Sequence, residues 1–328
     1  MKHYNEYKKA KIEMIKKYLD NKFIHNKHIQ ARQSTSNKQL DLFISINKFL
    51  AKEHSKGPNA DIGNINYMYQ NYSNVYDFFY ILTKYYGFDK VVCKPKFVLK
   101  YKNYIVNSAF IIYYDINEIT IPVDLKNTIQ DCISKNNIRF IYSGFIIDSS
   151  NNTGISHVNM IVIDLFKKTV ERFEPHGKYM VTDKYEVTMT KSIDDMIKTQ
   201  FMELSGLNDF KYISPVNLEP VIGPQLIGDL FTGMCVTFSM IYLHLRLMNP
   251  DVKPKSIVTY LTNLKTNGVK DMISRYARFI EDTLKNHQYD IEHNYDKLVK
   301  AWNSRQEYYL VSTNKRKIIM KRLVSSKK

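Results

Sequence analysis

The sequence predicts an α+β fold, because strand-like and helix-like segments are partly separated along the chain. Strand-like segments concentrate between residues 91 and 173, where β-branched and aromatic residues form short apolar runs. Helix-like segments lie on both sides of that region, with apolar residues recurring at helical spacing. The 328 residues, of which 44% are hydrophobic, are enough for one large domain, or for one domain with an additional region in front of it.

The first 120 residues are predicted to form a basic, mainly helical N-terminal region. Helical spacing of apolar residues occurs in segments 4–24, 40–50 and 74–87. The polar stretch SKGPNADIGN at 55–64 is typical of a linker. Residues 91–123 then read as two or three strands.

The middle of the chain, residues 121–290, is predicted as a second domain built around a β-hairpin. The hairpin is SHVNMIVIDLFKKTVERFEPHG, residues 156–177, with its turn at Phe166 to Thr169. A buried strand at 138–148 precedes it. Helices are expected at 124–134, 192–204, 233–248, 255–264 and 270–285, and the segment NDFKYISPVNLEPVIGPQ is expected to be extended and loop-like. Residues 291–328 are predicted as a basic tail with one short helical stretch.

The net charge of +16 is concentrated at the two ends of the chain. Residues 1–60 contain 13 Lys/Arg and 5 Asp/Glu, which gives +8, and residues 286–328 contain 10 and 4, which gives +6. Basic ends suit a polyanionic partner such as nucleic acid or an anionic membrane surface. A lysine-rich solvated surface explains the same pattern without a partner.

The three cysteines, Cys93, Cys132 and Cys235, show no paired spacing. We therefore expect neither a disulfide framework nor a cysteine metal site, and a reducing compartment fits this composition. The N-terminus lacks the apolar stretch of a signal peptide, and no run approaches the roughly 18 apolar residues of a membrane span. These observations predict an intracellular protein.

Cys235 is the candidate nucleophile, because it follows Gly233 at the start of a predicted apolar helix. The partial positive charge of a helix N-terminus favours the thiolate, which is the species that attacks a carbonyl. A buried cysteine that only fills space in an apolar helix is the alternative interpretation.

His157 opens the first strand of the hairpin and Glu174 ends the second, so folding the hairpin brings them towards each other. His157 is the candidate base and Glu174 the candidate orienting acid. Glu171, Asp164 and His176 are nearby competitors. Asp164 lies an odd number of residues from His157 and so faces the other side of a regular strand, and Glu171 and Glu174 likewise point oppositely. Gln225, in the loop before Cys235, is the candidate oxyanion donor.

The order His157, Glu174, Gln225, Cys235 resembles the adenain and SUMO-protease (Ulp1-like) superfamily of cysteine proteases. The segments ERFEPHG, GPQ and GMC resemble the form seen in large DNA viruses. The resemblance spans about residues 138–248. It implies a central mixed sheet flanked by helices, with the nucleophile at the start of a buried helix. It also implies a Cys-His-Glu triad, and cleavage of peptide or isopeptide bonds after Gly-Gly or Gly-x-Gly-type sequences, without a metal or organic cofactor.

The resemblance also implies a protein substrate, either a virion protein that is processed or a ubiquitin-like protein that is removed, in a virion or the host cytoplasm. The sequence departs from the family pattern in its substrate groove. Val158 replaces the usual Trp after the His, Val236 replaces the usual Gly after the Cys, and Gln225 lies further from Cys235 than usual. Two alternatives use the same features: an acetyltransferase with the same triad, and an inactive protease-like protein that binds nucleic acid through its basic ends.

Overall fold

The computed structural model describes the central part of the chain and selected segments outside it. The described residues are 83, 88, 91–93, 98–101, 104–107, 109–122, 124–150, 156–178, 184–218, 220, 222–228, 234–264, 266–288, 297, 300, 307–312 and 317–322. The helices expected at 4–24 and 40–50 lie outside these residues, as does nearly all of the one expected at 74–87.

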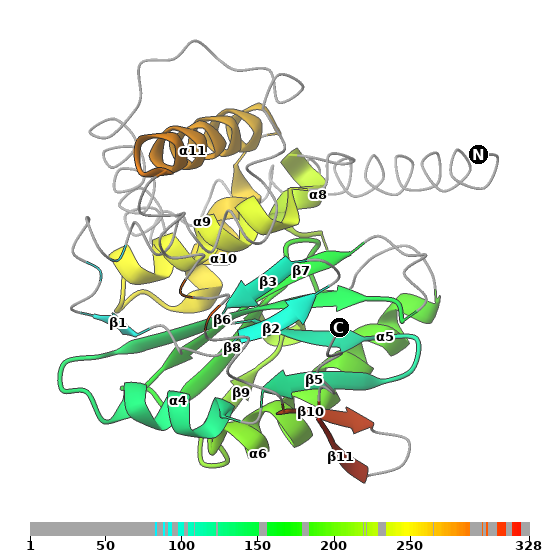
Figure 1. The fold of residues 1–328 in the computed structure, drawn as a ribbon. Helices are drawn as coiled ribbons and strands as arrows, with labels where there is room; N and C mark the ends of the chain where they lie inside the picture. The colour runs from blue at the N-terminus through cyan, green and yellow to red at the C-terminus, as the bar shows by residue number, and fades with distance from the viewer. Residues whose placement is uncertain are drawn as a thin grey trace.

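A mixed β-sheet forms the centre of the molecule (Figure 1). Its strands are ordered β11-β10-β5-β4-β6-β7-β8-β9, with β1 beside β6. The strands are β1 (Val92–Cys93), β4 (Ala109–Tyr113), β5 (Glu118–Pro122), β6 (Phe140–Asp148), β7 (His157–Asp164), β8 (Thr169–Phe173), β9 (Lys211–Ile213), β10 (Glu307–Ser312) and β11 (Lys317–Arg322). β2 (Val98–Tyr101) and β3 (Tyr104–Asn107) form a separate pair. The pairs β1–β6, β4–β6 and β8–β9 are parallel, and the other neighbours are antiparallel.

The hairpin strand β7 is buried along its whole length, as expected for a central strand covered on both faces. Alternate side chains enter two different cores. Val158, Met160 and Val162 pack into one apolar cluster, and Ile161 and Ile163 pack into the other. The continuous apolar run was therefore the right signal for this strand, although His157, Asn159 and Asp164 near its ends are polar.

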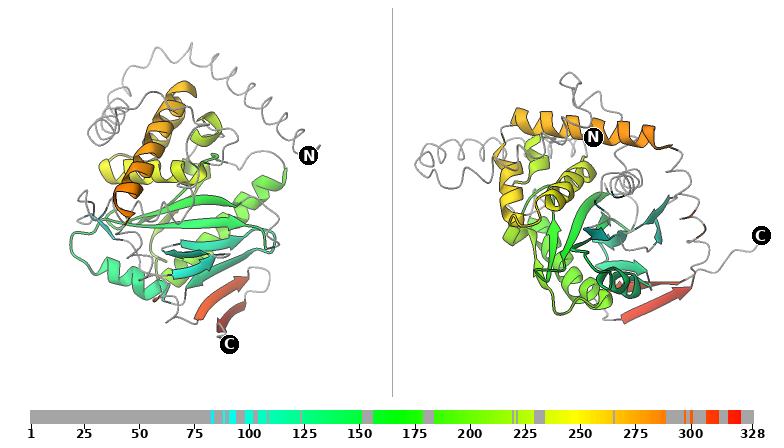
Figure 2. Two further views of the ribbon diagram at one scale, coloured as in Figure 1. Left: turned by 45° about the horizontal axis from the view of Figure 1, so that its top comes forward. Right: turned by 90° about the vertical axis from the view of Figure 1, so that its left-hand side faces the viewer.

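Helices cover both faces of the sheet, as the two views in Figure 2 show. One layer contains α7 (Pro215–Leu218), α8 (Pro224–Gly228), α9 (Cys235–Met248), α10 (Pro254–Asn263) and α11 (Thr266–Asn286). The other contains α4 (Leu125–Ile133), α5 (Lys184–Met196), the π-helical segment η5 (Ile197–Phe201) and α6 (Met202–Ser205). This arrangement confirms the predicted α+β class. Within the described residues no helix is long and apolar enough to cross a membrane.

The sheet takes strands from both sides of the expected domain limits. β4 and β5 precede residue 121 or straddle it, and β10, beyond residue 290, pairs with β5. The division into regions 1–120, 121–290 and 291–328 stays a prediction. The tail contains helical positions at 297 and 300, and it also contains the β10–β11 hairpin, which was not predicted. Five strands, β1 to β5, occupy the region where two or three were expected.

The expectation that the cysteines form no disulfide is wrong for one pair. Cys93 in β1 is joined to Cys132 in α4, with a Cα–Cα distance of 5.6 Å. The two residues are 39 apart in sequence, so no local spacing reveals them. They meet because β1 pairs in parallel with β6 beside α4, and both belong to the same apolar cluster. Cys235 is not part of a disulfide.

Cys132→Ser should lower the free energy of unfolding by roughly 4 kcal/mol, the loop-entropy estimate for a crosslink of this span. Urea denaturation of the oxidised proteins measures the difference, and reduction of the wild type should reproduce it. Cys235→Ser, which leaves the crosslink intact, is the control. Three reactive thiols in the denatured, unreduced wild type would show that the crosslink does not form.

Candidate active site

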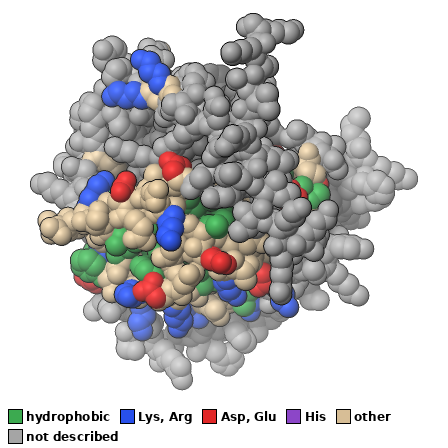
Figure 3. Space-filling view, turned by 60° about the horizontal axis from the view of Figure 1, so that its bottom comes forward, with side chains coloured by type: hydrophobic (Ala, Val, Ile, Leu, Met, Phe, Trp, Pro, Cys, Tyr) green, Lys and Arg blue, Asp and Glu red, His purple; other side chains and the backbone are tan. Residues whose placement is uncertain are grey.

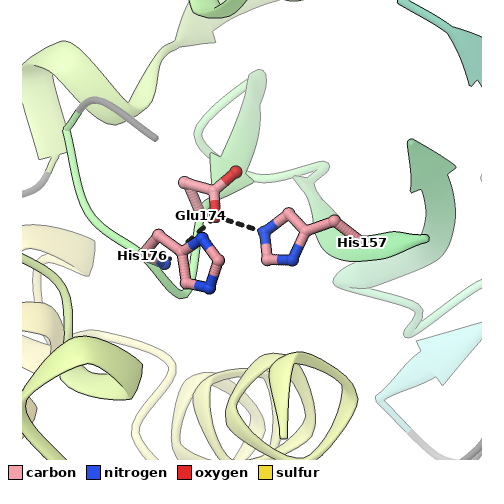
Figure 4. A group of neighbouring side chains, drawn as sticks. All are labelled: His157, Glu174 and His176. Carbon is pink, nitrogen blue, oxygen red and sulfur yellow. Dashed lines mark hydrogen bonds and ion pairs between the residues drawn. The ribbon is translucent and has the colours of Figure 1, made fainter. Parts of the chain in front are cut away.

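His157 and Glu174 meet at one end of the hairpin (Figure 4). His157 is the first residue of β7, and Glu174 directly follows the last residue of β8. The His157 Nε2 and Glu174 Oε1 atoms are 2.5 Å apart, and both side chains are buried. The antiparallel pairing of β7 and β8 returns the chain to its start and so creates this contact.

The electrostatics of the pair favour the charged form of both groups. Burial opposes the imidazolium, but the Glu174 carboxylate and a hydrogen bond with Cys235 outweigh it and raise the pKa of His157 to about 10. Burial also opposes the carboxylate, but the charge and hydrogen bond of His157 lower the pKa of Glu174 to about 2. The arrangement is an imidazolium–carboxylate pair.

Cys235 approaches the same imidazole from the helix layer that contains α9. It is the first residue of α9, which packs against β7, and its side chain is buried and hydrogen-bonded to His157. Because Nε2 of His157 bonds to Glu174, Nδ1 is the ring nitrogen left for the sulfur. The structure therefore brings Cys235, His157 and Glu174 together from a helix start, a strand start and a strand end.

Gln225 lies in α8, and the backbone around it is hydrogen-bonded to the residues that follow Glu174. The Gly223 N–H donates to the His176 carbonyl at 2.7 Å, and the Gln225 N–H donates to the Pro175 carbonyl at 3.1 Å. Gly223 permits this approach, because a Cβ there would lie 2.4 Å from both Gly177 N and Pro175 O. The backbone that carries Gln225 is thus fixed to the backbone that carries Glu174.

The competing carboxylates lie elsewhere, as their position in the strands predicted. Asp164 is the last residue of β7, at the opposite end of the strand from His157. Its Oδ2 atom lies 3.4 Å from Arg139 Nη2 and 3.6 Å from Arg246 Nη2. Glu171 faces α9, where it accepts from Arg246 Nε at 2.9 Å and from Tyr242 Oη at 3.0 Å. The carboxylate that hydrogen-bonds His157 is that of Glu174 and neither of these two.

His176 is close to the pair but has a different arrangement. Its ring stacks on that of His157 with centroids 4.3 Å apart and an angle of 22° between the planes. Its backbone N–H donates to Glu174 Oε1 at 3.0 Å. Within the described residues, the metal-ligand atoms of His157, Glu174 and His176 form a group, all within 4.8 Å of one another. The two rings lie in nearly parallel planes, so the lone pairs of their nitrogens do not converge on one point. The arrangement therefore fits the hydrogen bond between His157 and Glu174 better than a metal site.

Sequence reasoning missed Arg172, whose Nη2 lies 3.4 Å from Glu174 Oε2 with both side chains fully buried. A signal was available, because Arg172 lies two residues before Glu174 in a strand that is otherwise apolar or paired. It also missed Asp194 in α5, which bonds to Arg172 Nη1 at 2.8 Å. No local pattern points to Asp194.

Comparison with known proteins gives one sequence relative and several weak structural likenesses. No protein-family model matches the chain. A putative ankyrin repeat protein of Acanthamoeba polyphaga mimivirus is 30% identical over 186 residues, which are 50% of this chain and 23% of that protein. The chain thus spans about a quarter of the length of this relative.

Solved structures with a weak likeness to the chain include a protease domain and an effector protein. The C-terminal Ulp1 protease domain in complex with Smt3, the yeast ortholog of SUMO, has a TM-score of 0.33 and 14% identity, covering 72% of this chain and 93% of that chain. The Chlamydia trachomatis effector Cdu1 bound to ubiquitin has a TM-score of 0.30 and 12% identity, covering 70% and 83%. These low TM-scores describe a weak likeness, so the functional conclusion depends on the site residues themselves.

Gly223→Ala should separate the segment that holds Gln225 from the segment that follows Glu174, because the added methyl group meets backbone atoms that cannot rotate away. We expect a loss of stability of about 1–3 kcal/mol, the usual cost of overpacking. Thermal denaturation followed by circular dichroism measures it. Gly268→Ala, where the nearest atom to the new Cβ is 3.8 Å away, is the matched control. Equal melting temperatures for both variants would contradict this account of Gly223.

Glu174→Gln should destabilise the protein in a pH-dependent way. The raised pKa of His157 gives stability that is complete below its unfolded value of 6.5 and lost as the pH rises through about 10. The lowered pKa of Glu174 gives stability that is complete above 4.5 and lost as the pH falls through about 2. The difference between wild type and variant should therefore be largest between pH 4.5 and 6.5 and decline towards pH 10.

Urea denaturation across this pH range measures the difference. Asp164→Asn is the control, because Asp164 is paired with two arginines and with no histidine, so its loss should give no decline towards pH 10. A Glu174→Gln difference that does not vary with pH would contradict the ion pair.

Proposed function

We propose that the chain is a cysteine peptidase in which Cys235 is the nucleophile, His157 the general base and acid, and Glu174 the orienting carboxylate. The observation that carries the proposal is the position of His157, whose imidazole hydrogen-bonds both Glu174 and Cys235 in a buried site. A thiol beside an imidazolium at a helix N-terminus is the arrangement that activates a cysteine for attack on a carbonyl.

The reaction follows from these positions. The Cys235 sulfur, as a thiolate, forms a bond to the carbonyl carbon, and the carbonyl oxygen takes the negative charge. The His157 imidazolium then gives its proton to the leaving amine, and the C–N bond breaks to leave a thioester on Cys235. His157 next takes a proton from water, the hydroxide attacks the thioester, and the acid product leaves as the thiolate returns. Gln225 and the Cys235 backbone N–H are proposed as oxyanion donors.

A protein is the proposed substrate, cleaved after a Gly-Gly or Gly-x-Gly-type sequence. This part of the proposal comes from the resemblance of the hairpin, GPQ and GMC segments to the adenain and SUMO-protease superfamily. A ubiquitin-like modifier and a virion protein are the two substrate classes that it implies, and both are cleaved by the same chemistry. The mimivirus relative supports a role in a large DNA virus, where virion or host cytoplasm is the expected place of action.

The nucleic-acid-binding alternative gains no support from the described part of the face in Figure 3. Figure 3 shows Lys/Arg and Asp/Glu side chains interspersed on the described part of one face. Residues 1–60, which carry half of the net charge, lie outside the described residues. The acetyltransferase alternative shares the triad and differs in the acceptor, so labelling by acetyl-CoA together with absence of peptide cleavage would favour it.

Cys235→Ala should abolish turnover of a fluorogenic ubiquitin or SUMO C-terminal substrate, and His157→Ala should lower it by at least ~10²-fold, the usual contribution of a general acid–base. Both variants should retain the wild-type circular dichroism spectrum. In the wild type, iodoacetamide should modify Cys235 well below roughly pH 8, the range of an ordinary thiol, and His157→Ala should remove that reactivity. Turnover that survives in Cys235→Ala would overturn the proposal.

A further inference from the structure

A network of buried polar contacts extends from Glu174 on the side away from Cys235. Arg172, whose side chain is fully buried, contacts Glu174 Oε2 through Nη2 at 3.4 Å. Its Nη1 donates to Asp194 Oδ1 at 2.8 Å, and its Nε donates to Asn159 Oδ1 at 2.8 Å. All three sides of the guanidinium are therefore occupied, which fixes its position beside Glu174.

Asp194, at the outer end of this network, is itself held by a further contact. Asp194 belongs to α5, and its Oδ1 atom also accepts a hydrogen bond from Tyr212 Oη in β9 at 2.6 Å. Lys198 of η5 lies over the Tyr212 ring, 5.5 Å from its centroid. These contacts thus run from the His157–Glu174 pair to the helix layer on the face of the sheet opposite α9.

Stability alone is a poor reason for this arrangement. The Arg172 guanidinium lies over the ring of Phe145, a member of one apolar cluster, with its central carbon 5.7 Å from the ring centroid. Burying one cation between two carboxylates costs desolvation free energy, and apolar replacements of buried ion networks are often as stable. The network does, however, hold both oxygens of Glu174, since Oε1 bonds to His157 and Oε2 contacts Arg172.

We propose that Arg172 and Asp194 are positioning residues, which fix the Glu174 carboxylate and balance its charge so that the imidazolium–thiolate pair of His157 and Cys235 forms. This inference rests on the proposed function. Arg172 acts on Glu174 directly, and Asp194 acts by offsetting part of the Arg172 charge. The site would then depend on helix α5 as well as on helix α9.

The sign of the effect follows from the charges that face the pair. Glu174, Arg172 and His176 lie in or after β8, Asp194 in α5, Tyr212 in β9 and Cys235 in α9. Replacing Asp194 by Asn leaves the Arg172 charge less balanced and makes the potential at His157 more positive. A more positive potential disfavours the imidazolium of His157 and favours negative charge on the Cys235 sulfur. Replacing Arg172 by Gln leaves two carboxylates less balanced and has the opposite effect.

The test is the rate of Cys235 alkylation by iodoacetamide against pH, which needs no substrate. The wild-type profile should have a low inflection where the thiolate forms and a high inflection where the imidazolium loses its proton. Asp194→Asn should move both inflections to lower pH by roughly half to one unit, and Arg172→Gln should move both to higher pH by a similar amount.

Asp164→Asn is the matched control. Asp164 is an equally buried carboxylate paired with arginines, but it ends β7 seven residues from His157, roughly 23 Å along an extended strand. This variant should leave both inflections in place even if it lowers the melting temperature. If Asp194→Asn does not fold, Tyr212→Phe is measured in its place. Loss of the hydroxyl donor leaves the Asp194 charge less offset and should move both inflections to higher pH.

The outcomes separate the two proposals. A wild-type profile without a low inflection would overturn the proposed function. A wild-type profile with both inflections, together with an Asp194→Asn profile that coincides with it, would overturn only the positioning role. An equal shift in Asp164→Asn would also overturn it, because the effect would then be general to buried charges.

Discussion

The contact between His157 and Glu174 is the interaction on which the rest of the site depends. It joins the start of β7 to the end of β8, so it exists only when the hairpin has its native register. A slip of one residue would turn His157 to the other face of the sheet and place polar side chains in an apolar cluster. The same packing that stabilises the hairpin therefore also assembles the pair.

Three parts of the chain then converge on this pair from different directions. The start of α9 brings the Cys235 thiol, and the segment before it is bonded to the backbone after Glu174 through Gly223. From the other face, Arg172 meets the remaining carboxylate oxygen. The imidazole is therefore confined between a sulfur, a carboxylate and the stacked ring of His176, with little freedom to reorient.

The sequence predicted the parts of the site that depend on local pattern. The apolar run Ile161–Ile163 located the hairpin, and Gly233 before an apolar helix located Cys235. The Cys93–Cys132 disulfide and the Arg172–Asp194 contact each join a strand to a helix. They depend on how elements far apart in the sequence pack together, which no local spacing encodes. The β10–β11 hairpin had a usable signal in its Tyr, Leu and Val residues, which the high charge of the tail obscured.

The π-helical segment η5 constrains how this chain can vary in length. It connects α5 to α6, and its extra residue changes the phase of the helix between Asp194 and Phe201. Both side chains point to the sheet, where Asp194 meets Arg172 and Phe201 stacks on Phe110 with centroids 4.6 Å apart. Deleting one residue from this segment would rotate one of them by about 100° away from its partner. Homologues that keep both contacts should therefore keep this helix at constant length, even where neighbouring loops gain or lose residues.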